Sequence, residues 1–153
     1  MDAIDRKILR QLQHDADRPI AAIAEAAGIS TTPCWRRIQN LEKAGVITAR
    51  VALLDRKALN VGVTVFVNIR TSGHTAASLE ALAREISGIE EVVEFYRMSG
   101  TVDYLLRVVV PDIAAYDAVY KRLIRVPGLA DVSSAFAMEE IKYTTELPLG
   151  YAG

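Results

Sequence analysis

Hydrophobic and polar positions follow two different periods along the chain, and the change of period divides it into two parts. Up to about residue 45, apolar residues recur every three or four positions, which is typical of amphipathic helices. The pattern predicts helices over residues 2–13, 17–28 and 31–45, with a tight turn at Gly28. Two short helices joined by such a turn make a helix-turn-helix, so we expect an N-terminal helix-turn-helix domain of the winged type.

The second part contains β-branched and aromatic runs of strand length in place of the helical period. Strands are predicted at residues 63–71, 91–98, 103–110 and 132–142, and amphipathic helices at 75–87 and 112–125. The resulting βαββαβ order predicts a ferredoxin-like sandwich with two helices on one face of an antiparallel sheet, and hence an α+β protein. The other face of the sheet, rich in Val, Phe and Ala, predicts a two-fold homodimer.

An apolar stretch at residues 46–54 joins the two parts. It has no proline and few small polar residues, so it is predicted to be a linking strand or hinge rather than a flexible tether. We therefore expect residues 1–60 to form the helix-turn-helix domain with its linking strand, and residues 61–153 to form the αβ-sandwich.

The third predicted helix has one apolar face and one polar face. At 100° per residue, Cys34, Ile38 and Leu41 form a buried stripe, and Trp35 flanks it where it can pack against the first helix. Residue types that read base edges and phosphates in a major groove occupy the outer face and its rim: Thr31, Thr32, Arg36, Arg37, Gln39, Asn40 and Lys43. Any surface helix has a charged outer face, but a single-sign cluster that follows a Gly turn favours a recognition helix for double-stranded DNA.

Composition excludes several classes of function. No apolar run approaches the roughly 20 residues of a membrane span and no signal-peptide core is present, so a cytoplasmic protein without membrane contact is expected. One cysteine and two distant histidines, His14 and His74, provide no disulfide, no metal site and no cofactor site. No nucleophile–base pair or phosphate-binding loop is recognisable, so we expect no catalytic residues. Residues 1–50 hold eight Lys and Arg against six Asp and Glu, while the net charge of the whole chain is −1, so only the first part suits a polyanion.

Short motifs in both parts resemble one known family. The first part contains Asp5-Arg6-x-Ile8-Leu9, Thr32-Pro33-Cys34 and Arg37-Ile38-x-x-Leu41-Glu42-x-x-Gly45-Val46-Ile47. The second contains Ser99-Gly100-x-x-Asp103-Tyr104-Leu105-Leu106, Val110-Pro111-Asp112, Pro127-Gly128 and Met138-Glu139-Glu140-Ile141-Lys142. Each motif is weak alone, but the ordered set covers nearly the whole chain and is similar to the Lrp/AsnC, or feast/famine, transcription regulators. The resemblance implies a DNA-reading domain, a linking strand, and a sandwich that dimerises through its sheet and often assembles further, into octamers.

The resemblance also implies an allosteric effector, a free amino acid bound between subunits near the Ser-Gly-x-x-Asp loop. Carried over to this sequence, the candidate effector-binding residues are Met98, Gly100, Thr101, Asp103 and Tyr104, with Ser134, Phe136 and Met138 from the last strand. Such a loop suits an amino acid, because Gly100 allows backbone N–H groups to approach a carboxylate and Asp103 can pair with an ammonium group. Thr101 stands where the family often has an acidic residue. From the residues alone, the loop is also what an ordinary hairpin turn would look like.

Further likenesses indicate one subgroup of the family. They are Thr31-Thr32-Pro33-Cys34-Trp35, Arg97-Met98-Ser99-Gly100 and Ser133-Ser134-Ala135-Phe136-Ala137-Met138-Glu139, which are similar to the subgroup that includes the cysteine-responsive regulator of cysteine detoxification. This likeness implies a sequence-specific transcription regulator of amino-acid metabolism with cysteine as its effector.

The sequence also allows two other functions, and it leaves the role of Cys34 open. The alternatives are a global architectural DNA-binding protein with little sequence preference and a small ferredoxin-like metabolic enzyme. Cys34 is expected to be a small buried hydrophobe, but its position near a helix N-terminus leaves a redox role as the alternative.

Overall fold

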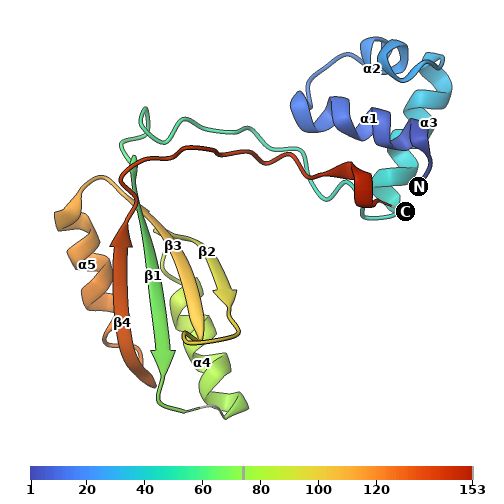
Figure 1. Cartoon of the computed structure of the whole chain (residues 1–153). Helices are drawn as coiled ribbons and strands as arrows, with labels where there is room; N and C mark the ends of the chain where they lie inside the picture. The colour runs from blue at the N-terminus through green and yellow to red at the C-terminus, as the bar shows by residue number, and fades with distance from the viewer. Residues whose placement is uncertain (74, 153) are drawn as a thin grey trace. The chain divides into compact units, whose positions relative to one another are not determined.

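The chain folds into two compact units (Figure 1). The structure is a computed structural model that describes residues 1–73 and 75–152. Met1–Leu53 and the segment from Lys142 onward form the first unit, and Leu54–Ile141 form the second. This differs from the expected division after residue 60, because the last residues of the chain return to the helical unit instead of ending in the sandwich.

Three helices with a short turn between the second and the third build the first unit. They are α1 (Ala3–His14), α2 (Ile20–Ala27) and α3 (Thr31–Lys43). Asp2 caps α1, since its carboxylate accepts from the backbone N–H of Asp5 and the Asp5 carboxylate accepts from that of Asp2. Gly28 ends α2 with a φ of 77°, a left-handed value at which glycine closes a helix with little steric cost. The predicted helix-turn-helix is confirmed.

The three helices share one small apolar core. It buries Ile8, Ile23, Ala24, Ala27, Cys34 and Ile38, which confirms the inward-facing stripe predicted for the third helix. Trp35 differs from the expectation, because its side chain is 50% exposed and does not contribute to this core. Half of Trp35 is therefore exposed at the surface of α3.

The segment that leaves α3 forms no strand. Residues 48–55 have no regular structure and residues 56–60 form a turn. Of the two expected alternatives, a linking strand or a hinge, the strand is thus not formed within residues 46–62, because a strand needs a neighbour to receive its backbone hydrogen bonds. Val51 and Leu53 remain 71% and 65% exposed, so the apolar character of this stretch is not explained by burial.

The second unit is a four-stranded antiparallel sheet with two helices. Its elements in chain order are β1 (Val63–Thr71), α4 (Ala76–Ser87), β2 (Val92–Arg97), β3 (Tyr104–Val110), α5 (Ile113–Leu123) and β4 (Leu129–Phe136). The strands lie in the order β2-β3-β1-β4, as Figure 1 shows, and all neighbours are antiparallel. This arrangement confirms the predicted ferredoxin-like sandwich. The last strand begins and ends earlier than predicted, since residues 137–142 lie outside the sheet.

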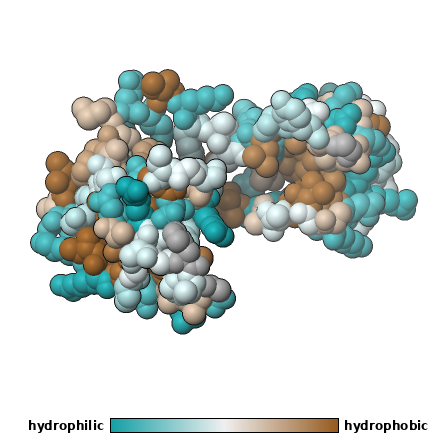
Figure 2. Space-filling view, turned by 60° about the horizontal axis from the view of Figure 1, so that its bottom comes forward, coloured by the Kyte–Doolittle hydropathy of each residue, from teal (hydrophilic) through white to brown (hydrophobic). Residues whose placement is uncertain are grey.

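The two faces of the sheet differ in character. The face packed against α4 and α5 holds the core of the unit, which includes Val65, Val67, Ile69, Leu82, Ile86, Leu106, Val119 and Leu123. Because side chains alternate along a strand, Phe66 and Asn68 of β1 and Arg107 of β3 lie on the other, open face. Most valines of the strands face the helices, so the open face is more polar than the sequence predicted. Figure 2 shows hydrophobic side chains among hydrophilic ones on the surface in view.

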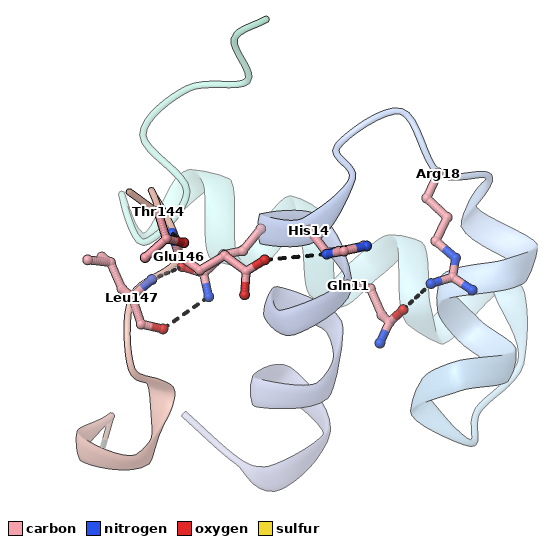
Figure 3. Close-up of polar contacts among 7 residues, drawn as sticks. Gln11, His14, Arg18, Thr144, Glu146 and Leu147 are labelled. Carbon is pink, nitrogen blue, oxygen red and sulfur yellow. Dashed lines mark hydrogen bonds and ion pairs between the residues drawn. The ribbon is translucent and has the colours of Figure 1, made fainter. Parts of the chain in front are cut away.

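The end of the chain packs on the first unit. Residues 142–148 have no regular structure, and a short 3-10 helix, η1 (Leu149–Tyr151), follows. Figure 3 shows Glu146 and Leu147 beside α1, where Glu146 faces His14. The helix-turn-helix unit therefore contains two stretches that are far apart in the sequence.

Candidate functional site

The outer surface of α3 carries five candidate DNA-reading side chains that are exposed. They are Thr31, Thr32, Arg36, Asn40 and Lys43. None of these side chains forms a hydrogen bond or ion pair with another residue that the structure describes. Their donors and acceptors are therefore available to water or to a ligand, as base-edge and phosphate contacts require.

Arg37, by contrast, is held by two acids of the α1 N-terminus. Its Nη1 lies 2.7 Å from Asp5 Oδ1 and 2.7 Å from Asp2 Oδ2. The carboxylates of Asp5 and Asp2 raise the pKa of Arg37, while the backbone N–H of Asp5, and then Arg37, lower the pKa of Asp2. These contacts tie α3 to α1, so Arg37 fixes the position of the predicted recognition helix.

Gln39 is also engaged within the chain. Its side-chain amide donates to Glu42 Oε2 at 3.0 Å, and Arg50 donates to Glu42 Oε1 at 2.8 Å. One N–H of the Gln39 amide is thus used within the chain, while its second N–H and its oxygen have no partner among the described residues. Two of the predicted DNA-reading residues are thus part of intramolecular networks, which the helical spacing alone did not reveal.

A hollow of about 610 Å³ lies beside the exposed surface of α3. Arg36, Arg37 and Asn40 of α3 and Asp5 of α1 are among its lining residues. Arg36 and Asn40 lie four residues apart and therefore share one side of the helix. Arg and Asn are the side chains that form paired hydrogen bonds with guanine and with adenine, so this side of α3 combines two base-reading groups.

Cys34 is completely buried at the start of α3. Burial raises the pKa of its thiol above the ordinary value. A protonated, inaccessible thiol is a poor nucleophile and a poor metal ligand, so the structure favours the packing role of Cys34 over the redox role. Within the described residues, no three His, Cys, Asp or Glu side chains are grouped as a metal site, and no helix is both long and apolar enough to cross a membrane.

The candidate effector loop joins β2 to β3. The backbone N–H of Met98 donates to the carbonyl of Asp103 at 2.8 Å, and Gly100 adopts a φ of 114°, a value that favours glycine. Thr101 is exposed at the tip of the loop. No backbone N–H of residues 99–102 donates to an acceptor in the described chain, so these groups can meet a carboxylate.

Asp103 is anchored to the end of β1. Its Oδ2 accepts from the backbone N–H of Thr71 at 2.7 Å and from Thr71 Oγ1 at 3.0 Å, and its own N–H donates to Ile69 O at 2.9 Å. The Asp103 carboxylate therefore fixes the loop to the end of β1. Pairing with the ammonium group of an amino-acid effector would be a second role of the same carboxylate. The sequence alone does not indicate that Thr71 binds Asp103, because only the pairing of β1 with β3 brings the two residues together.

Three further effector candidates point toward the helices and not into the loop. Tyr104 is buried and packs on Phe95, with ring centroids 5.3 Å apart. The Ser134 hydroxyl is hydrogen-bonded to the Tyr116 hydroxyl, and the Phe136 ring meets the Tyr116 ring edge-on at 5.3 Å. Within one chain, these side chains pack between the sheet and the helices.

Strand register also separates the candidates of the last strand from the loop. β4 runs antiparallel to β1, so Ser134 and Phe136 lie beside the first half of β1, whereas the loop adjoins Ile69 in the second half. Four residues of strand separate Phe136 from the level of Ile69, on the order of 13 Å. Met138 follows β4 and its side chain is 96% exposed. A single chain therefore does not bring these three residues to the loop.

Comparison with known proteins agrees with this architecture. The AsnC-type helix-turn-helix domain matches residues 1–42, and the Lrp/AsnC ligand binding domain matches residues 64–147. The DNA-binding transcriptional activator DecR of Escherichia coli is 47% identical over 150 residues, which cover 97% of this chain and 99% of DecR.

Two solved structures extend the comparison to the fold. The crystal structure of an AsnC family transcriptional regulator from Agrobacterium tumefaciens is 63% identical, with a TM-score of 0.96 and 99% of each chain covered. A transcriptional regulator from Neisseria meningitidis, solved in complex with L-Met, is 32% identical with a TM-score of 0.93, covering 98% of this chain and 97% of that chain. The alternative of a metabolic enzyme is thereby set aside. The chain belongs to the Lrp/AsnC family of transcription regulators.

Proposed function

We propose that the protein regulates the transcription of genes of amino-acid metabolism by binding specific DNA sequences, with α3 as its recognition helix. The observation that carries the proposal is the pair Arg36 and Asn40, one helical turn apart, exposed, and without a polar partner in the part of the chain described. In the major groove, these side chains would form paired hydrogen bonds with guanine and adenine. Thr31 and Thr32 at the start of α3, with Lys43 at its end, suit the flanking phosphates.

A homodimer is the proposed DNA-binding form. The open face of the sheet has exposed aromatic side chains at Phe66 and Tyr96, and burying such a face against its own copy gives a closed two-fold assembly. Two recognition helices would then read half-sites about one turn of DNA, or a multiple of one turn, apart. The family resemblance supports further assembly, into octamers.

A free amino acid is the proposed effector, and the β2–β3 loop is its proposed site. The backbone N–H groups of residues 99–102 suit its carboxylate, and the L-Met complex of the Neisseria regulator supports this class of ligand. Cysteine is the first candidate, because the subgroup motifs resemble a cysteine-responsive regulator. An effector would act by favouring one assembly geometry and thereby shifting the affinity for DNA.

Selection of DNA from a random duplex pool tests the DNA-binding proposal. The affinity for a selected duplex is compared, at one fixed salt concentration, with that for a duplex of the same composition and shuffled sequence. We expect a preference of at least about a thousandfold, as is typical of specific binding. Equal affinities would identify a global architectural protein and overturn the proposal.

A thermal-shift screen with each of the twenty amino acids tests the effector. A ligand that binds the native assembly raises its melting temperature. A higher melting temperature with cysteine supports the proposal. A higher melting temperature with a different single amino acid identifies that amino acid as the effector in place of cysteine. No rise with any amino acid contradicts the proposed class of effector.

A further inference from the structure

The C-terminal segment is held on α1 through its own backbone. The side-chain amide of Gln13 donates to the carbonyl oxygen of Leu147 at 3.2 Å and accepts from the Leu147 N–H at 2.6 Å. At the far end of the segment, Arg6 Nη1 donates to the carbonyl oxygen of Ala152 at 2.9 Å. These bonds use main-chain atoms of the segment, so α1 binds it largely through its backbone.

Apolar burial contributes little to this docking. Leu147 and Tyr151 are 72% and 92% exposed, and Leu149 is half-buried. A groove of about 450 Å³, lined in part by Leu9 and Leu12 of α1, remains beneath the segment. A few hydrogen bonds must therefore offset the entropy lost on ordering the segment, so we expect the docked and released states to lie close in free energy.

A second polar contact of the segment is weaker. His14 Nδ1 lies 3.4 Å from Glu146 Oε1, and both side chains are exposed to solvent. Figure 3 shows this contact beside that of Leu147 on the same helix. An exposed pair of this kind contributes little, so Gln13 and Arg6 are the residues of α1 that hold the segment.

The docked segment gives the first unit a second connection to the second unit. The chain leaves the first unit after Leu53 and returns to it after Ile141. In the second unit, Arg56 holds both connections together, since it donates to Thr64 Oγ1 at 2.6 Å and also to Glu140. Only residues 141–146 lie between Glu140 and Leu147, the residue whose backbone Gln13 binds. Fully extended, this stretch of chain spans at most about 24 Å.

We propose that residues 142–152 form a strap, and that its docking on α1 raises the affinity for DNA with two half-sites. The inference rests on the proposed function above. A unit attached through two short connections samples fewer orientations than a unit attached through one. Less orientational entropy is then lost when both recognition helices of a dimer engage DNA at once. Release of the strap therefore lowers the affinity for two half-sites and leaves the affinity for one half-site unchanged.

Gln13→Met is the variant that tests the strap, because it removes both hydrogen bonds at nearly constant size and helix propensity. Gln11→Met is the matched control, since Gln11 lies on the same helix and contacts Arg18 rather than the strap (Figure 3). We expect amide hydrogen exchange at Leu147 to become at least about tenfold faster in Gln13→Met and to stay unchanged in Gln11→Met. Unchanged exchange in both variants would overturn the docking.

The functional readout uses two duplexes, one selected by the wild-type protein and the same duplex with one half-site replaced by random sequence. We expect Gln13→Met to bind the two-half-site duplex about fivefold more weakly, and the single half-site within about twofold of the wild type. A second variant that ends at Thr144 should show the same pattern. Equal affinities for Gln13→Met and Gln11→Met, or equal losses on both duplexes, would overturn the strap. Failure of the wild-type protein to select any duplex would overturn the proposed function itself.

Discussion

The guanidinium of Arg37 lies 2.7 Å from a carboxylate oxygen of Asp5, which joins α3 to the first turn of α1. The preceding residue, Arg36, projects about 100° away around the helix and has no polar partner among the described residues. Two adjacent arginines therefore have different roles, since one positions the helix and the other is left to read DNA.

Arg36→Ala is expected to weaken DNA binding without changing stability. Loss of a paired contact with guanine costs about 1–3 kcal/mol of binding free energy and relaxes the base preference at one position. Lys43→Ala is the comparison, because loss of a phosphate contact lowers the affinity for all sequences by a similar factor. Binding measured on a set of single-base operator variants distinguishes the two patterns. An Arg36→Ala variant with wild-type affinity and base preference would contradict the orientation of α3 proposed here.

Arg37→Ala is expected to lower the stability of the helical unit. Without the guanidinium, the carboxylates of Asp2 and Asp5 face each other at the start of α1, so the melting temperature should fall. Asp5→Asn is the partner variant, and a double-mutant cycle separates the ion pair from the capping role of Asp5. Circular dichroism melts in the absence of DNA provide the measurement. An Arg37→Ala protein with the wild-type melting temperature and reduced DNA affinity would instead assign Arg37 to DNA contact.

Local signals in the sequence were sufficient for most of the fold. The helical period placed Cys34, Ile38 and Leu41 inside, and Gly28 ended α2 as expected. A β-branched and aromatic run located β1 at its observed limits, Val63–Thr71. These features depend on residues close together in the chain, which is why a pattern can reveal them.

The site was predicted less well because it depends on contacts between distant residues. Asp103 finds Thr71 through strand register, and Ser134 finds Tyr116 across the sheet–helix interface. The return of residues 142–152 to α1 likewise has no local signature, since its bonds use the backbone of Leu147. Trp35 flanks the apolar stripe and is half-exposed, since helical spacing alone does not determine how far a flanking residue is covered.

Asp103→Asn and Thr71→Val are expected to separate the structural role of the loop aspartate from ligand binding. Asp103→Asn removes the charge of the acceptor but keeps an oxygen, and Thr71→Val removes only the Oγ1 donor. Each variant therefore weakens the hydrogen bonds between the loop and β1, at a cost of about 0.5–1.5 kcal/mol of unfolding free energy. If Asp103 also pairs with the effector ammonium, only Asp103→Asn loses the ligand-induced rise in melting temperature. Urea denaturation and the thermal-shift assay measure the two quantities. Equal loss of the ligand response in both variants would assign Asp103 a structural role alone.

Stability is expected to fall in acid through Glu94. Arg107 Nη2 donates to Glu94 Oε1 at 2.6 Å, and this bond is the main reason that the pKa of Glu94 lies below its usual value. A carboxyl with a lowered pKa in the folded state stabilises the protein above its unfolded pKa, about 4.3, and that stability is lost as the pH falls.

The measurement is the free energy of unfolding in urea between about pH 6 and pH 3. The wild-type protein should lose stability more steeply than Glu94→Gln, whose amide does not titrate. Asp2 also has a lowered pKa and contributes to both curves, so the difference between them isolates Glu94. Parallel curves for the two proteins would show that the Arg107 contact does not persist in solution.

Cys34 is expected to resist thiol reagents until the helical unit opens. Its side chain is fully buried and burial raises the pKa of the thiol, so the native state presents almost no accessible thiolate to a disulfide reagent. Cys34→Ala should cost about 1 kcal/mol of unfolding free energy, because the cavity is small. Cys34→Ser should cost about 1–3 kcal/mol, because it buries a hydroxyl among apolar neighbours. The rate of modification should rise with urea in parallel with unfolding, and fast modification of the native protein that also alters DNA binding would restore the redox alternative.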